Sequence, residues 1–174
     1  LFAFLAVPNP GATAGAQRRL IYRQNSLYHR IFVYRRGSLV SLEFGKRRDA
    51  VMQSLVDRSN MRRNMLEYVS LSFAGLLYHP EPERVLVVGL GGGVIPREMH
   101  HYFPKARIDV VEIDPEIEKI AQRFFGFAED ENLRVHVADA RMFIQRQLHR
   151  ERVPKYDLVV LDALVGAVGI VGEG

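Results

Sequence analysis

Cysteine is absent from all 174 residues, which excludes disulfide bonds and thiolate metal ligands. The sequence contains no apolar run near the roughly 20 residues that a membrane-spanning helix needs. Basic segments with interleaved aromatic residues, which would indicate RNA binding, are also missing. The six histidines lack acidic or histidine partners at the sequence spacing of metal ligands. We therefore expect no metal site, no nucleic-acid partner and no complete membrane span in this chain.

Acidic residues are scarce in the first half of the chain. Residues 1–83 contain 12 Lys and Arg against 6 Asp and Glu, a net charge of +6, whereas residues 84–174 contain 12 against 14, a net charge of −2. A basic half can attract nucleic acid or an anionic surface. Because no recognition motif accompanies these charges, we interpret them as a solvated, arginine-rich face.

Residues 1–16 differ in composition from the rest of the chain. An apolar stretch is followed by proline, glycine and small residues, and it ends in Ala14-Gly15-Ala16. This pattern resembles the end of a secretory signal sequence with its cleavage site. A disordered apolar N-terminus or the end of a truncated membrane span would explain the same residues. The compartment stays open: cytoplasmic, or periplasmic or membrane-tethered if the leader is real.

Residues 17–82 predict a small N-terminal antiparallel β unit and a linking helix. Apolar, β-branched and aromatic residues predict strands over 27–34 and 39–44, with a third short strand near 50–52. Such a unit is marginal alone and should pack on something.

The linking helix is expected to begin at Ser59, a candidate N-cap, and to run to about His79 with apolar residues at helical spacing. Pro80 and Pro82 follow, and proline cannot continue a helix. These prolines indicate a domain boundary near residue 82.

From residue 83 onward, expected strands alternate with expected helices. The strands cover 84–89, 108–112, 133–137 and 156–161, and the helices cover 94–102, 115–125 and 140–149. This alternation is typical of a parallel sheet with right-handed crossovers. We predict an α/β fold, in which residues 83–174 form a partial, C-terminally incomplete doubly wound sheet that is Rossmann-like and of the methyltransferase type.

A glycine loop follows the first of these strands, in the stretch VLVVGLGGGVIPRE that contains Gly89, Gly91 and Gly93. Glycines allow backbone N–H groups and a helix N-terminus to approach a ligand closely. The dinucleotide fingerprint G-x-G-x-x-G is incomplete, because its third glycine is Val94 here. A triphosphate loop is excluded, since no Gly-Lys-Ser/Thr follows.

Acidic residues stand at the carboxyl ends of the next strands. Glu112 lies 23 residues after Gly89, where a carboxylate can bind ribose hydroxyls. Asp139 can accept a hydrogen bond from an adenine amino group beside the Ala140 N–H, or it can simply cap a helix. Asp162 ends the fourth strand over the same crevice, whereas Asp114 is explained by an N-cap role. Together these residues predict an adenosine-binding edge.

The combination VLVVGLGGGVIPRE, VVEIDP, VADAR and YDLVVLDA, preceded by a β unit, resembles the spermidine synthase (polyamine aminopropyltransferase) family over about residues 20–163. The chain is most similar to its divergent bacterial spermidine synthase-like branch. The VEID and YD-x-x-x-x-D elements are shared with many S-adenosylmethionine methyltransferases. The β unit favours aminopropyltransferases.

The resemblance implies a donor, an acceptor and a set of site residues. The donor would be decarboxylated S-adenosylmethionine, or S-adenosylmethionine in a methyltransferase, and the acceptor a small amine, with no metal; family members are commonly homo-oligomers. Gly89 and Gly91 would line the sulfonium end, Glu112 would bind ribose, and Asp139 and Ala140 would bind adenine. The resemblance also places Gln53 near the nucleoside and Tyr68 near the amine channel.

Two acidic positions of the family are lost in this sequence. Gly92 stands where the family loop has an aspartate, and Val165 stands at the position of the general base, whereas Asp162 matches the first aspartate of that motif. The basic N-terminal half would also repel a polyamine. Three hypotheses follow: an aminopropyltransferase, an S-adenosylmethionine-dependent methyltransferase, or a degenerate nucleoside-binding module or fragment without catalysis. Beyond Ala163 the sequence matches nothing in the family, and we expect the chain alone to self-associate through the uncovered edge of its sheet.

Overall fold

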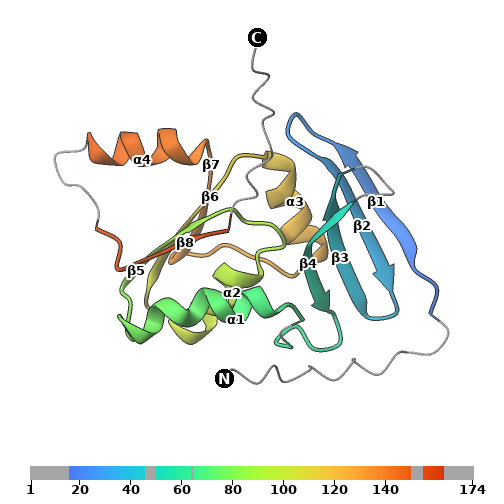
Figure 1. Cartoon of the computed structure of the whole chain (residues 1–174), viewed down its shortest axis with the longest axis horizontal. Coiled ribbons are helices and arrows are strands. Elements are labelled where there is room, and N and C mark those ends of the chain that lie inside the picture. The colour runs from blue at the N-terminus through green and yellow to red at the C-terminus, as the bar shows by residue number, and fades with distance from the viewer. Residues whose placement is uncertain (1–15, 46–49, 64, 150–154, 163–174) are drawn as a thin grey trace, which may run out of the picture.

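The computed structural model describes residues 16–45, 50–63, 65–149 and 155–162. Residues 1–15 of the expected leader, and Val165, lie outside this part of the chain. The described residues form two four-stranded sheets, one antiparallel and one parallel (Figure 1). None of the helices within these ranges is both long and apolar enough to cross a membrane.

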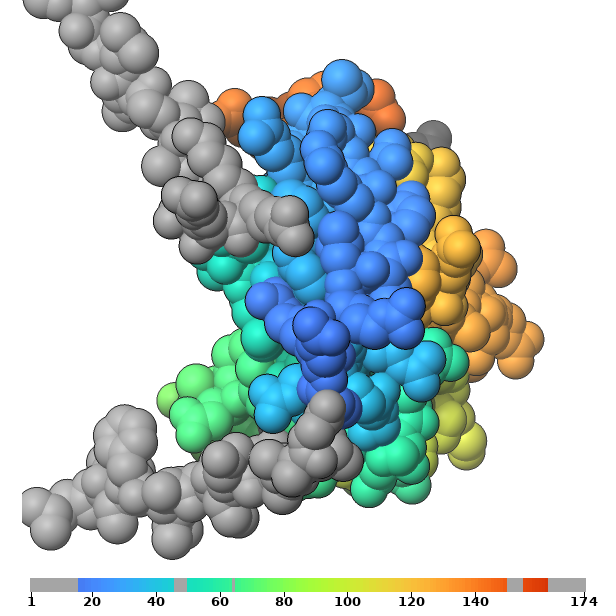
Figure 2. All heavy atoms as spheres, turned by 90° about the vertical axis from the view of Figure 1, so that its right-hand side faces the viewer, coloured from blue at the N-terminus to red at the C-terminus, as the bar shows by residue number. Residues whose placement is uncertain are grey.

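The antiparallel sheet is built from consecutive strands in the order β1-β2-β3-β4. Its strands are β1 (Arg19–Asn25), β2 (Arg30–Arg36), β3 (Leu39–Phe44) and β4 (Val51–Asp57). Figure 2 shows that β1 and β2, in blue, form the face of the molecule on this side. The predicted β unit is present, but it has four strands and its last strand is longer than expected.

The predicted strand over 27–34 was wrong at its beginning. Leu27 lies in the turn between β1 and β2 and is 97% exposed. The Ser26 hydroxyl accepts hydrogen bonds from the backbone N–H groups of Tyr28 and His29, at 3.1 and 2.8 Å. This side-chain-to-backbone turn overrides the strand preference of the apolar residues beside it.

The predicted helix from Ser59 to His79 was also wrong in its first part. Helix α1 spans only Glu67–Ser72, and it is followed by the 3-10 helix η1 over Phe73–Leu77. Ser59 does not cap a helix, because both its N–H and its hydroxyl donate to the Asp57 carboxylate, at 2.9 and 2.6 Å. The chain therefore turns after β4 and forms its helix later.

The parallel sheet has the strand order β7-β6-β5-β8, as expected for a partial doubly wound fold. Its elements are β5 (Arg84–Val88), α2 (Val94–Tyr102), β6 (Arg107–Glu112), α3 (Pro115–Phe124), β7 (Leu133–Val137), α4 (Ala140–Leu148) and β8 (Leu158–Leu161). These bounds agree with the predicted ones within two residues. The α/β fold class is confirmed.

One apolar core joins the two sheets. Ile31, Val33 and Leu42 on the inner face of the antiparallel sheet are fully buried, and they belong to the same cluster as Val87 and Phe125 of the α/β part. Figure 1 shows α3 lying between the two sheets. A smaller cluster, formed by Leu86, Val88, Val111 and Phe143, packs α4 onto the other face of the parallel sheet. The antiparallel sheet thereby comes to lie beside the carboxyl ends of the parallel strands.

Candidate functional site

The register of the parallel sheet brings the predicted site residues to one edge. Val88 pairs with Val111 on one side and with Leu161 on the other. The residues that directly follow these three are therefore neighbours at the carboxyl ends of their strands: Gly89, Glu112 and Asp162. Ligands bind in this crevice in open α/β sheets.

A cavity of about 250 Å³ opens at this edge. Seven of the eight predicted site residues line it: Gln53, Gly89, Gly91, Glu112, Asp139, Ala140 and Asp162. They come from β4, the glycine loop, the end of β6, the start of α4 and the end of β8. We call this space the strand-end cavity. No group of three or more His, Asp or Glu side chains among the described residues is arranged to hold a metal ion.

The eighth predicted residue, Gly93, does not line the cavity. Its φ of +70° suits glycine, and it precedes the first residue of α2. A Cβ atom at this position would lie 2.5 Å from the Phe127 ring. This glycine permits close packing of the helix start against Phe127. Its predicted role beside a ligand stays a prediction.

Glu112 holds the glycine loop through its carboxylate. The side chain is only 8% exposed, and its two oxygens accept hydrogen bonds from the backbone N–H groups of Leu90 and Asp114, both at 2.9 Å. An ionised carboxylate has about four acceptor positions. Glu112 can therefore bind ligand hydroxyls while it keeps these two backbone contacts.

Asp139 caps α4, as one of the two alternatives for this residue predicted. Its carboxylate accepts a hydrogen bond from the Met142 N–H at 2.9 Å, and its backbone is extended. Asp114 caps α3 in the same way through the Glu116 N–H, and it also accepts a hydrogen bond from the Ser26 hydroxyl of the antiparallel sheet. The cap leaves Asp139 on the cavity wall beside Ala140.

Asp162 lines the cavity at the end of β8, whereas Tyr68, which the resemblance placed near the amine channel, does not line it. The Tyr68 hydroxyl donates to the Gln53 carbonyl oxygen at 2.9 Å. Burial, and secondly the charge of Asp162, raise the pKa of Tyr68 to about 12, so the phenol is neutral at physiological pH. Asp162 has much exposed surface, but partial burial of its carboxyl raises its pKa to about 6. This end of the cavity thus holds one acid that titrates near neutrality.

Sequence reasoning missed an aromatic wall of the same cavity. His29 and Phe44 stack with their ring centroids 4.2 Å apart and their planes 12° from parallel. His29 comes from the β1–β2 turn and Phe44 from the end of β3, so only the folded sheet brings them together. The alternation of apolar and polar residues along the strands does not indicate that these two rings stack.

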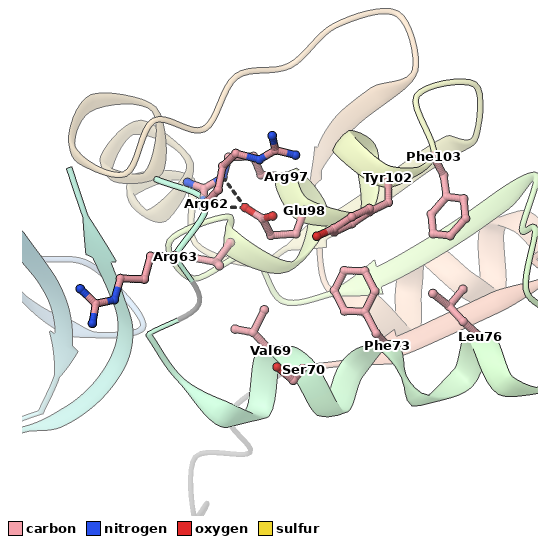
Figure 3. A pocket seen from close by; sticks show the side chains of 11 residues that line it. Arg62, Arg63, Val69, Ser70, Phe73, Leu76, Arg97, Glu98, Tyr102 and Phe103 are labelled. Atoms are coloured by element: carbon pink, nitrogen blue, oxygen red, sulfur yellow. Dashed lines mark hydrogen bonds and ion pairs between the residues drawn. The ribbon is translucent and has the colours of Figure 1, made fainter. Parts of the chain in front are cut away.

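A second, larger cavity of about 490 Å³ lies between α1, η1 and α2 (Figure 3). We call it the helix cavity. Its wall is mostly apolar and includes Val69, Phe73 and Tyr102, and the Phe73 and Tyr102 rings meet edge to face at 5.9 Å. The Arg97 guanidinium at one end donates to the carbonyl oxygens of Met61 and Phe125, at 2.8 and 2.9 Å, and pairs with Glu98. None of the predicted site residues lines this space.

Comparison with known proteins identifies the family. The family model described as the spermine/spermidine synthase domain matches residues 67–170. The chain belongs to the spermine/spermidine synthase family. It is 38% identical to a polyamine aminopropyltransferase of Vibrio vulnificus over 167 residues, which are 95% of this chain and 55% of that protein. The chain therefore spans about half the length of this relative.

Two solved structures illustrate the range of similar proteins. A probable spermidine synthase from Corynebacterium glutamicum matches with a TM-score of 0.67 at 19% identity, over 84% of this chain and 53% of that one. Human methyltransferase-like protein 13, in complex with SAH, matches with a TM-score of 0.54 at 36% identity, over 59% of this chain and 50% of that one. The first similarity shows the fold, and the second shows that more than half of the chain is also similar to a methyltransferase-like protein.

Proposed function

We propose that this chain binds an adenosyl-sulfonium donor in the strand-end cavity and transfers an aminopropyl group from decarboxylated S-adenosylmethionine to a small amine. The observation that carries this proposal is the convergence of seven predicted residues on one cavity in a member of the spermine/spermidine synthase family. The donor is a co-substrate, and no metal is needed for the chemistry.

The donor would lie across the carboxyl ends of β5, β6 and β7. Gly89 and Gly91 would line its sulfonium end, and Glu112 would accept hydrogen bonds from the ribose hydroxyls. Asp139 and the Ala140 N–H would face the adenine, and Gln53 would contact the nucleoside from β4. Each of these residues borders the same cavity, which supports a single bound nucleoside.

The reaction would be a direct displacement. The amine nitrogen attacks the methylene carbon beside the sulfonium, a C–N bond forms, and the C–S bond breaks with its electron pair going to sulfur. The products are the alkylated amine, a neutral thioether and one proton. The protein must place the amine in line with the breaking bond and keep it unprotonated at attack.

Asp162 would hold the cationic part of the acceptor. Its carboxyl borders the cavity, and with a pKa of about 6 it is mostly ionised at pH 7 and above. The Tyr68 phenol is neutral and donates to the Gln53 carbonyl oxygen, so it adds no charge near Asp162. We assign Asp162 to acceptor binding, and not to the general-base position, which falls on Val165.

A methyltransferase using S-adenosylmethionine is the second candidate. It is favoured by the 36% identity to human methyltransferase-like protein 13 and by Gly92, which stands where the aminopropyltransferases have an acid. The decarboxylated donor is a dication and benefits from that acid, whereas S-adenosylmethionine carries a compensating carboxylate. Donor preference therefore separates the two candidates.

Calorimetric titration with decarboxylated S-adenosylmethionine, S-adenosylmethionine and NAD in parallel tests the proposal. We expect the decarboxylated donor to bind most tightly and NAD not to bind. Preference for S-adenosylmethionine would replace the aminopropyltransferase by the methyltransferase. Binding of the decarboxylated donor without product formation from any small amine would indicate a degenerate module. Tight NAD binding would refute both the aminopropyltransferase and the methyltransferase.

Self-association remains part of the proposal. Strand β8 is an edge of the parallel sheet within the described residues, and Val159 and Leu161 on it are exposed. An exposed apolar edge strand pairs readily with another chain. We expect a homo-oligomer, and light scattering that gives a monomer mass at high concentration would contradict this.

A further inference from the structure

The backbone N–H groups of the glycine loop are almost all occupied by protein acceptors. Gly89 donates to the Val111 carbonyl oxygen at 2.8 Å, and Leu90 donates to Glu112 at 2.9 Å. Gly92 donates to the Ser54 hydroxyl oxygen, and Gly93 to the Leu90 carbonyl oxygen, both at 2.8 Å. These four bonds fix the loop in one conformation.

Gly91 supplies the remaining N–H of the loop. It lines the strand-end cavity, and within the described ranges its N–H has no acceptor. Its φ of +53° is a conformation that glycine adopts without strain. The peptide plane that carries this N–H lies between two planes held by side chains, those of the Leu90 and Gly92 amides. The Gly91 N–H is therefore the loop donor left for a ligand.

The hydroxyl that accepts the hydrogen bond from the Gly92 N–H belongs to a residue of the antiparallel sheet. Ser54 lies on β4 of the antiparallel sheet, 38 residues before Gly92, and is 2% exposed. Its hydroxyl oxygen is 3.1 Å from the place of a Cβ at Gly91. Ser54 does not line the cavity, so its contact with a ligand would be indirect.

The packing of Ser54 against the loop also leaves no space for a side chain at Gly92. A Cβ atom at this position would lie 2.8 Å from the Ser54 Cβ and 2.9 Å from the Phe125 ring. Real Cβ contacts do not approach so closely without a shift of the neighbours. The space that an acidic side chain would need is occupied by Ser54 and Phe125.

We propose that Ser54 is a positioning residue for the donor. With Glu112, it holds the glycine loop so that the Gly91 N–H faces the adenosyl ligand, and it makes the donor site of the α/β part depend on the antiparallel sheet. This inference rests on the proposed function for the identity of the ligand. The hydrogen bond from the Gly92 N–H to Ser54 is present without a ligand. Its effect on the loop can therefore be measured in the ligand-free chain.

Ser54→Ala, compared with Ser41→Ala, tests the proposal. Ser41 is a matched control, because it is also buried in the antiparallel sheet and its hydroxyl donates to Glu43, away from the strand-end cavity. In ligand-free protein we expect the amide of Gly92, which donates to Ser54, to exchange with solvent faster in Ser54→Ala only. The dissociation constant for decarboxylated S-adenosylmethionine should rise roughly 3- to 10-fold, the scale of one neutral hydrogen bond. The KM for the donor should rise while kcat at saturating donor is retained.

Two results would overturn the positioning role. One is unchanged exchange at Gly92, and the other is faster exchange with an unchanged donor dissociation constant. If the wild type binds no adenosyl ligand, the proposed function fails, but the exchange measurement still decides whether Ser54 holds the loop. Ser54→Cys, which keeps the side-chain size with a weaker acceptor, serves if the alanine variant does not fold, and the same readouts apply to it.

Discussion

The two cavities of this protein differ in volume and in the polar groups that their walls offer to a ligand. The helix cavity is about twice as large as the strand-end cavity, at about 490 against 250 Å³. At one end of it, the Arg97 guanidinium already binds two backbone carbonyl oxygens and Glu98. In the strand-end cavity, by contrast, several polar groups can still form hydrogen bonds with a ligand: the Gly91 N–H, the Glu112 carboxylate and Asp162. We therefore propose the strand-end cavity as the functional site because of its free polar groups, and not because of its volume.

The largest effect should come from Glu112→Ala. The variant removes a carboxylate that would bind the ribose and that anchors the Leu90 N–H. Loss of a hydrogen bond to a charged group costs about 1.5–3 kcal/mol, or roughly 10- to 150-fold in donor affinity. Calorimetry with decarboxylated S-adenosylmethionine measures the change.

Phe73→Ala is the matched variant in the helix cavity. It removes a ring that packs against Tyr102 and should lower thermal stability while donor affinity stays within twofold of the wild type. The comparison fails if Phe73→Ala weakens the donor as much as Glu112→Ala does.

Gly92→Ala should have the next largest effect, and we expect this effect on the free energy of unfolding. The added Cβ meets Ser54 and Phe125 below 3.0 Å in a buried loop. Overpacking of this kind typically costs about 1–3 kcal/mol. Urea unfolding should show a lower midpoint with an unchanged slope. A variant as stable as the wild type would mean that the loop and β4 are not in contact.

A smaller effect is expected from pH at Asp162. Its folded-state pKa of about 6 lies above the ordinary aspartate pKa of 3.8, so the folded state binds this proton more tightly than the unfolded state. Any stability from this proton is fully present below the unfolded pKa and is lost as pH rises through about 6. Binding of a cationic amine needs the ionised form, so the affinity for 1,4-diaminobutane, measured with the thioether product bound, should increase as pH rises through about 6. Asp162→Asn should remove this dependence, and an identical pH profile in the variant would contradict the assignment.

The smallest effect should come from Asp139, whose two roles can be separated. Asp139→Asn retains an N-cap oxygen for the Met142 N–H, whereas Asp139→Ala loses it and should cost about 1 kcal/mol of stability. If the residue also binds adenine, both variants weaken the donor by a few-fold. Full donor affinity in Asp139→Asn would leave the residue with its cap role alone.

The α/β part was predictable because local signals and the global fold agree there. Asp114 with Pro115 gives the start of α3, and it caps that helix in the structure. The parallel register then follows, and it alone places Gly89, Glu112 and Asp162 at one edge. The family resemblance was also confirmed. It could be detected in a single sequence because each of its motifs is a short continuous segment.

The N-terminal part was less predictable because side chains there compete with the backbone. Ser26 and Asp57 form turns that no periodicity indicates, and they displace a strand start and a helix start. His29, Phe44 and Ser54 come to the site or to its loop only through packing of one sheet against the other part of the chain. Their roles depend on contacts between residues far apart in sequence, which a single sequence does not contain.

The most direct test of the central claim is to map where the donor binds. Amide chemical shifts are followed by NMR while decarboxylated S-adenosylmethionine is titrated into the protein. We expect the largest shifts at Gly91, Gly92, Glu112 and Ala140, with little change at Val69 and Tyr102. Shifts centred on Val69, Phe73 and Tyr102, with an unperturbed glycine loop, would contradict this expectation.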